Sequence, residues 1–192
     1  SYLYKDVLSL IGIRKPALLE KLLRALALQM GSEVSYSELS NLLEVDKATI
    51  AKYIDILEKS FIVFQLNSFS RNQRNEIKSN RKIYFYDNGI RNMIINNLNP
   101  IDLRNDKGAL WENFLIAERI KVQAYHEQFA NYYFWRTIQK QEIDFIEESG
   151  GAINAFEFKW KSGGRNKIPK SFLENYNAQG MTIDRANFRE FI

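Results

Sequence analysis

The sequence predicts a mixed α/β (α+β) protein in which a helical part is followed by a part where helices and strands alternate. Two strand-like runs, residues 61–66 and 81–86, follow the leucine-rich helical segments. After a polar linker, the pattern changes to one helix, three strands, a second helix and a last strand. The buried helical face near the start has the spacing i, i+3, i+4 and i+7. It is formed by Leu18, Leu19, Leu22, Leu23, Leu26 and Met30.

Length and composition are those of ordinary globular proteins, with 192 residues, 45% of them hydrophobic and 26% charged. We expect two domains, residues 1–104 and 105–192, joined by the polar linker after Asn99-Pro100. The absence of cysteine excludes disulfides, thiolate catalysis and cysteine-ligated zinc. No apolar run is long enough to span a membrane and no signal peptide is evident, so a cytoplasmic location is expected.

The first domain has the pattern of two short helices joined by a tight turn. Ser35 and Glu38 are spaced as a capping box, and Asp46 is placed to cap a helix that ends near Lys59. The hairpin formed by the two strand-like runs follows directly, and together these elements form a winged helix-turn-helix pattern. Residues 1–10 already have the spacing of an apolar helix, so we expect this chain to be a piece of a longer protein.

The basic surplus lies in the first domain. Residues 1–104 hold 15 basic and 11 acidic side chains, whereas residues 105–192 hold 12 of each. DNA is the expected partner, with base contacts from the second helix and phosphate contacts from the hairpin loop. The residues expected to bind nucleic acid are Lys47, Thr49, Lys52, Arg71, Arg74, Lys78 and Lys82. The alternative is that the winged helix packs against protein, because basic loops are common solvated surfaces and Asp55 and Glu58 would repel phosphate.

The second domain has the predicted order α-β-β-β-α-β. A long helix over residues 108–125 precedes strands at 132–137, 142–147 and 152–160, and Gly150-Gly151 forms the last hairpin turn. A second helix is expected over 168–177 and a short strand over 181–184.

An acidic constellation is predicted in this domain from the order of its charged residues. Glu157 and Lys159 alternate with aromatic residues and therefore share one face of their strand, and Asp144 on the preceding strand can lie beside Glu157. Glu112, in the first turns of the long helix, can point at the same place. Three carboxylates and a lysine suit a metal-dependent phosphodiesterase, with Glu112, Asp144 and Glu157 holding Mg²⁺ or Mn²⁺.

Each of these residues also has a simpler explanation. A glutamate near a helix N-terminus is favoured by the helix dipole, and Glu-x-Lys on a strand can be an exposed ion pair. Their order in one compact unit, among apolar neighbours that make an unpaired charge costly, favours the shared site. His126 is the only histidine and has no partners for a zinc site or a catalytic triad, and no phosphate-binding loop motif is present.

Several segments resemble the C-terminal region that follows the ATPase module in a group of predicted prokaryotic AAA-type ATPases. They are SYLYKDV, KIYFYDNGIRN, GALWENFLIAE, EIDFI and AFEFKW, and they cover nearly the whole chain. The last part of that family is similar to PD-(D/E)XK, or restriction-endonuclease-like, nucleases. The resemblance implies that Glu112, Asp144, Glu157 and Lys159 form the catalytic site, and that ATP would bind only to the missing ATPase half.

Three hypotheses follow. The first is a nucleic-acid-processing module in which the winged helix positions DNA and the acidic site hydrolyses a phosphodiester with Mg²⁺. The second is a non-catalytic DNA- or protein-binding regulatory module of the ATPase. Under either hypothesis, assembly into a homo-oligomer is an open expectation. The third is a plain transcription regulator, which leaves the second domain unexplained.

Overall fold

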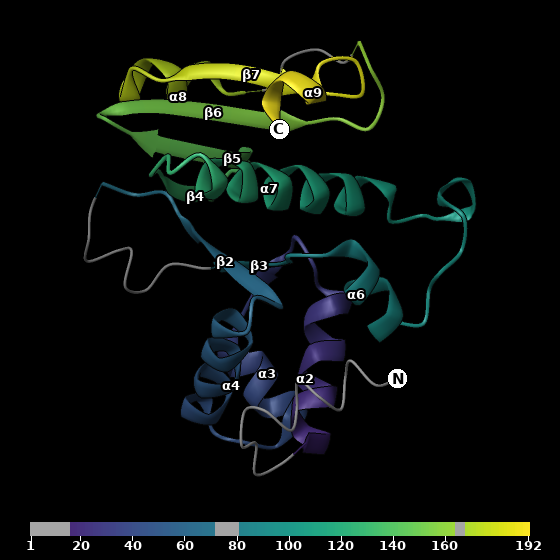
Figure 1. Ribbon diagram of the computed structural model, residues 1–192. Helices are drawn as coiled ribbons and strands as arrows, with labels where there is room; N and C mark the ends of the chain where they lie inside the picture. Colours follow the sequence, from purple (N-terminus) through teal and green to yellow (C-terminus); the bar gives the residue numbers. More distant parts are fainter. Residues whose placement is uncertain (1–15, 72–80, 164–167) are drawn as a thin grey trace.

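The computed structural model describes residues 16–71, 81–163 and 168–192 (Figure 1). The helix expected over residues 1–10, together with Arg74 and Lys78 of the hairpin loop, lies outside the described residues. The protein is mixed α/β. The predicted elements that lie among the described residues follow one another in the expected order, and the short strand Glu33–Val34, the 3₁₀ helix Ile101–Leu103 and the terminal helix Phe188–Phe191 are additional.

The helices of the first part begin where their capping residues predict. Helix α2 is Pro16–Leu28, α3 is Tyr36–Leu43 and α4 is Lys47–Lys59. The Ser35 hydroxyl accepts a hydrogen bond from the Glu38 N–H at 3.3 Å, and the Asp46 carboxylate accepts one from the Thr49 N–H at 2.7 Å. Both predicted caps are therefore present.

One seven-stranded sheet runs through the described structure, in the order β1-β3-β2-β4-β5-β6-β7. The hairpin of the first part pairs with the second part through β2 and β4, which are parallel, so the two parts share a single sheet. Figure 1 shows α2, α3 and α4 at one end of this arrangement and β6 and β7 at the other. The first three strands are β1 (Glu33–Val34), β2 (Val63–Ser68) and β3 (Arg81–Phe85).

The linker is tied down by buried arginines. Helix α6 is Asn88–Ile94 and is followed by the short 3₁₀ helix Ile101–Leu103. Arg91 and Arg104 both bind the Asp106 carboxylate, at 2.5 and 2.7 Å, directly before helix α7. The start of α7 is therefore anchored to both α6 and the linker.

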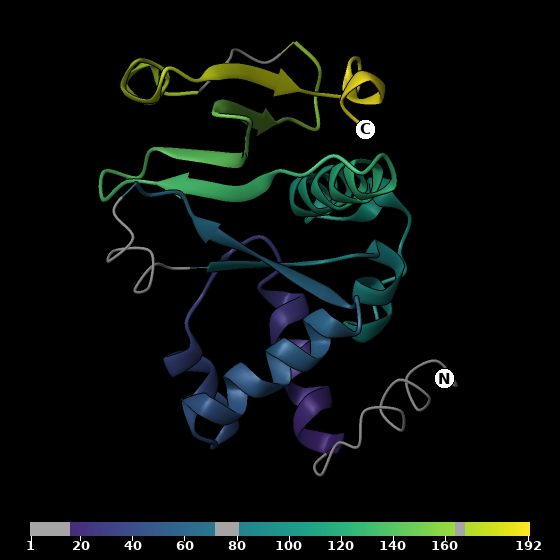
Figure 2. The same cartoon turned by 60° about the vertical axis from the view of Figure 1, so that its left-hand side comes forward.

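Helix α7 (Lys107–Tyr125) lies across the sheet, as both views show (Figures 1 and 2). The buried Asn113 amide accepts from the Phe85 N–H at 2.7 Å and donates to the Phe85 carbonyl at 2.9 Å. The Asn113 side chain thus takes the place of a neighbouring strand at the end of β3. It satisfies both backbone groups of Phe85, which would otherwise be buried without partners. This contact fixes the position of the first turns of α7 over β3.

The remaining elements complete the sheet and cover it. The strands are β4 (Asn131–Arg136), β5 (Glu142–Ser149), β6 (Ala152–Phe158) and β7 (Gln179–Ile183), and the helices are α8 (Lys170–Tyr176) and α9 (Phe188–Phe191). Gly150 and Gly151 both have positive φ, 58° and 81°, in the predicted hairpin turn.

Among the described residues, three apolar cores result from this arrangement. The first lies among α2, α3, α4 and the hairpin, the second between α7, α9 and the sheet, and the third between α8 and the opposite face of the sheet. In the described part of the chain, no helix has the length and apolar character needed to cross a membrane.

Candidate functional site

An irregularity in β5 aims Asp144 along the sheet. The register between β4 and β5 shifts between Tyr133 and Trp135, so that one extra residue of β5 is accommodated there. Ile143 and Ile146 consequently pack in the same core although they are three residues apart. Strict alternation would place Glu142, Asp144 and Ile146 on one face of β5. The shift breaks this alternation, and the Asp144 carboxylate accepts a hydrogen bond from the Phe158 N–H at 2.8 Å.

Asp144 lies beside Glu157, as the hairpin register predicts. Regular pairing of β5 with β6 ends at Phe145 and Phe156, the residues next to this pair. The two carboxylates open into a cleft of about 350 Å³, which Glu142 also lines together with Lys140, Gln141 and Pro169. The cleft therefore presents three carboxylates at the point where the two strands cease to pair.

Glu112 comes from α7 and reaches the same cluster from the side of β3. Its Oε1 accepts a hydrogen bond from the Tyr84 hydroxyl at 2.6 Å. A side chain at Gly31, whose φ is +76°, would place its Cβ 3.5 Å from this oxygen. Burial raises the pKa of Glu112, while Lys82 and the Tyr84 hydrogen bond oppose that rise and Glu142 and Glu157 add to it.

Lys82 belongs to this cluster, which corrects the prediction that it binds nucleic-acid phosphates. Its side chain is only 4% exposed, because Lys82 faces inward from β3. The ammonium Nζ lies 2.6 Å from Glu142 Oε1 and 3.7 Å from Glu112 Oε1. Burial alone would lower the pKa of Lys82, but Glu112, Glu142 and Asp144 raise it above its ordinary value, so the side chain stays charged.

Lys159 forms an ion pair with Glu157, one of the carboxylates that line the cleft. Glu157 is paired in register with Thr182 of the parallel strand β7, so both side chains project from the same face. The Thr182 hydroxyl is buried, and among the described residues it has no hydrogen-bond partner. An additional polar ligand beside Glu157 would satisfy this hydroxyl.

The electrostatics of the cluster favour binding of a cation. Burial, Glu112 and Glu157 raise the pKa of Asp144 to about 8, against the lowering effect of the Phe158 hydrogen bond and of Lys82. The carboxyl group is therefore largely protonated at neutral pH unless positive charge is added. A divalent cation would supply that charge and return Asp144 to its anionic form.

The donor atoms suit Mg²⁺ or Mn²⁺, but their present arrangement does not form a metal cage. Carboxylate and hydroxyl oxygens are the ligands that these ions prefer. Within the described ranges, however, no group of three or more acidic or histidine side chains is positioned to hold one ion. Ammonium groups bind the carboxylates instead, Lys82 at Glu142 and Glu112 and Lys159 at Glu157.

The residues expected to bind nucleic acid are only partly available on the surface. Lys47 and Lys52 are exposed on α4, but the Thr49 hydroxyl donates to Asp46 at 2.9 Å and is engaged in capping. Arg71 is exposed, with its guanidinium 5.6 Å from the centre of the Tyr176 ring. The exposed cations on α4 are thus Lys47 and Lys52 in its N-terminal half and Lys59, which is paired with Asp55, at its C-terminal end.

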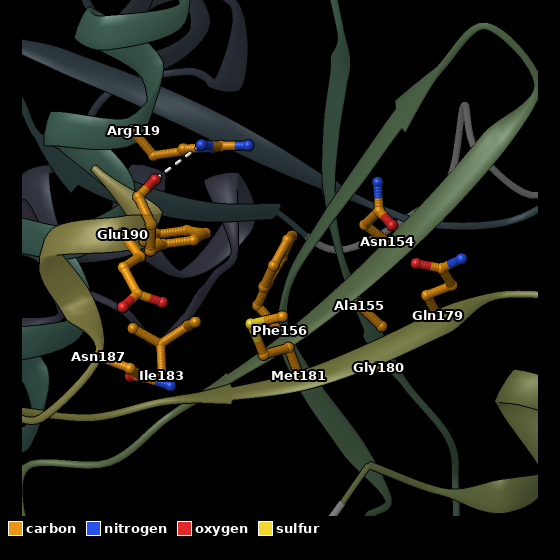
Figure 3. Close-up of a pocket in the computed structure, with 11 residues that line it drawn as sticks. Arg119, Asn154, Ala155, Phe156, Gln179, Gly180, Met181, Ile183, Asn187 and Glu190 are labelled. Carbon is orange, nitrogen blue, oxygen red and sulfur yellow. Dashed lines mark hydrogen bonds between the residues drawn. The ribbon is translucent and has the colours of Figure 1, made fainter.

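A second pocket, of about 340 Å³, lies on the α7 side of β6 and β7 (Figure 3). Figure 3 shows Arg119 and Glu190 at one end and Asn154 and Gln179 at the other. Arg119 binds Glu147 at 2.7 Å and the Phe191 carbonyl at 2.7 Å, so its guanidinium joins α7 to β5 and α9. None of the predicted site residues lines this pocket.

Three members of the acidic cluster were missing from the predicted site: Lys82, Tyr84 and Glu142. The first two come from β3, which the sequence places in the other domain, and β3 contacts α7 directly through the Asn113–Phe85 and Tyr84–Glu112 hydrogen bonds. Glu142 could have been included, since it precedes Asp144 by two residues in the same strand.

The fold and site define a mixed α/β protein in which one seven-stranded sheet joins a largely helical first part to a second part that carries an acidic cleft. The chain belongs to the family called domain of unknown function DUF8612, which matches residues 1–101. A second family, domain of unknown function DUF4143, matches residues 107–189, and it is associated with the C-terminal regions of AAA-type ATPases.

Relatives in three bacteria are themselves uncharacterized. Proteins of Mycobacterium bovis and Mycobacterium tuberculosis are each 31% identical over 162 residues, which is 83% of this chain and 36% of the relative. A protein of Haemophilus influenzae is 25% identical over 162 residues, 80% of this chain and 36% of the relative. The chain thus spans about a third of the length of these relatives. No solved structure gives a significant match.

Proposed function

We propose that the chain is the C-terminal region of an AAA-type ATPase, and that its acidic cleft is a metal-dependent phosphodiesterase site of the PD-(D/E)XK type. One observation carries this proposal: Asp144, turned by the irregularity in β5, opens into the same cleft as Glu157 and Glu142. Glu112 of α7 is connected to this group through Lys82, whose ammonium lies 3.7 Å from Glu112 and 2.6 Å from Glu142, which supports a shared role for the three predicted carboxylates.

The chemistry assigned to each residue follows from its position. Glu112, Asp144 and Glu157 would hold Mg²⁺ or Mn²⁺, which when bound orients water and neutralises charge on the scissile phosphate. Lys159 holds Glu157 in the cleft and, once released, places a positive charge beside the substrate phosphate. Lys47, Lys52 and Arg71 are the exposed cations proposed to contact the DNA backbone.

A second function is favoured by the lysines in the cluster. With Lys82 and Lys159 pairing the carboxylates, the cleft is partly neutralised without a metal ion. This arrangement supports a non-catalytic DNA- or protein-binding regulatory module, in which the ATPase half drives remodelling. A fold can keep the geometry of an enzyme without its activity.

A cleavage assay separates these functions. Labelled single-stranded and duplex DNA are incubated with the protein in Mg²⁺ or Mn²⁺, and products are compared for wild type, Glu157→Gln and the exposed control Glu174→Gln. The phosphodiesterase proposal expects cleavage by wild type and the control, with a loss of at least about 100-fold in Glu157→Gln. DNA binding without cleavage in any metal would support the regulatory module instead.

A further inference from the structure

Lys82 reaches the acidic cluster from outside the nuclease-like part. It lies on β3 of the hairpin, yet it binds Glu142, which is 60 positions further along the chain, at 2.6 Å. Leu66 is its partner on β2, and the ammonium group lies 5.3 Å from the centre of the Phe134 ring. The shared sheet therefore inserts a cation of one part into the acidic site of the other.

The position of this ammonium is one that a metal ion would also need. It is within 3.7 Å of Glu112 and 2.6 Å of Glu142, and its electrostatic effect extends to Asp144. A divalent cation bound by Glu112 and Asp144 would lie close to the ammonium, where like charges repel strongly because the surroundings are poorly solvated. Lys82 and a metal ion therefore compete for the same carboxylates.

We propose that Lys82 is an intramolecular competitor of the divalent cation, so that the site loads fully only when Lys82 releases Glu112 and Glu142. This inference rests on the proposed function of the cleft and adds a means of regulating it. Release of the Lys82 side chain from Glu112 and Glu142 would change metal affinity, which couples the hairpin to the acidic site. Lys82 is thus a positioning residue that acts through the carboxylates.

Metal binding, measured without reference to activity, tests the inference. Isothermal titration of Mn²⁺ is carried out on wild type, Lys82→Met, Lys82→Arg and the control Lys140→Met, which removes an exposed charge from the rim of the same cleft. Lys82→Met is expected to bind Mn²⁺ at least about tenfold more tightly than wild type. Lys82→Arg, which keeps the charge, and Lys140→Met should remain within about threefold of wild type.

A second pair of variants is needed because Lys82→Met leaves Glu142 without its partner and can therefore misfold. Glu142→Gln is compared with the double variant Lys82→Met/Glu142→Gln, because replacing both members of a partly buried pair is better tolerated than leaving one buried charge unpaired. The double variant should bind more tightly than Glu142→Gln. Equal Mn²⁺ affinity with and without Lys82 would overturn the proposed competition while still supporting a metal site. The absence of Mn²⁺ binding in every variant would overturn both proposals.

Discussion

The carboxylate of Asp144 accepts a hydrogen bond from the Phe158 N–H at 2.8 Å, across the end of the β5–β6 ladder. A side chain thus takes the place of the next backbone acceptor, and the two strands part beside the cleft. This contact fixes the position of the Asp144 carboxylate at the point where the two strands separate to form the cleft.

Asp144→Asn should flatten the pH dependence of stability. The pKa of Asp144 is raised from 3.8 to about 8, so the folded state binds a proton more tightly than the unfolded state. Its contribution is fully present below pH 4 and is lost as pH rises through 8. Urea denaturation between pH 4 and pH 9 should show a smaller loss of stability in Asp144→Asn than in wild type; parallel curves would contradict the assigned burial.

Asp106→Asn should destabilise the fold by about 2–4 kcal/mol at neutral pH, because two buried guanidinium groups lose their shared carboxylate. Hydrogen bonds from Arg104 and Arg91 lower the pKa of Asp106 to about 2. The stabilisation is therefore present above pH 4 and is lost as pH falls from 4 towards 2. Chemical denaturation measures the change, and the exposed Asp102→Asn in the same linker should differ from wild type by less than about 0.5 kcal/mol.

Asn113→Ala should cost about 2–4 kcal/mol, since it leaves both backbone groups of Phe85 buried without their partner. The same variant should weaken Mn²⁺ binding, because Asn113 positions the turn of α7 that carries Glu112. Urea denaturation and metal titration are the measurements. Lys121→Ala, on the exposed side of the same helix, serves as the control, and an equal effect there would argue against a specific clamp.

Tyr84→Phe should destabilise the protein by about 1–3 kcal/mol at pH 7, because the partly buried Glu112 loses the hydroxyl that donates to it at 2.6 Å. The exposed Tyr125→Phe provides a matched control with no expected change. Thermal or chemical unfolding distinguishes them. A Tyr84→Phe variant as stable as wild type would mean that Lys82 alone satisfies Glu112.

Lys47→Ala/Lys52→Ala should weaken binding to duplex DNA about 3- to 30-fold at moderate salt. The slope of log affinity against log salt concentration should become shallower by up to about two, as expected for the loss of up to two phosphate contacts. Lys59→Ala on the same helix is the control, because Lys59 is at the far end and paired with Asp55 at 2.7 Å. Fluorescence anisotropy at several salt concentrations measures both quantities. An equal loss in the control would indicate a non-specific effect of charge.

The local elements could be predicted from the sequence because they depend on local chemistry. The caps Ser35 and Asp46, the Gly150-Gly151 turn and the position of Asp144 beside Glu157 all follow from short-range spacing. Element ends were less accurate: the predicted strand over residues 152–160 ends at Phe158.

The contacts between the two parts could not be predicted in this way. A lysine at the start of a basic hairpin strand is expected to be exposed to solvent. The burial of Lys82 instead results from the parallel pairing of β2 with β4, which no local pattern specifies. The irregularity in β5 was also missed, because strict alternation is the default for a strand. Both features decide which charges enter the cluster.

The most direct test of the acidic cleft is anomalous diffraction from crystals of wild-type protein soaked in saturating Mn²⁺. The proposed function predicts a peak about 2 Å from carboxylate oxygens of both Asp144 and Glu157, with Lys82 displaced from Glu112. A cleft without a peak, in protein that retains its ion pairs from Lys82 and Lys159, would contradict the metal site and leave a binding module neutralised by its own lysines.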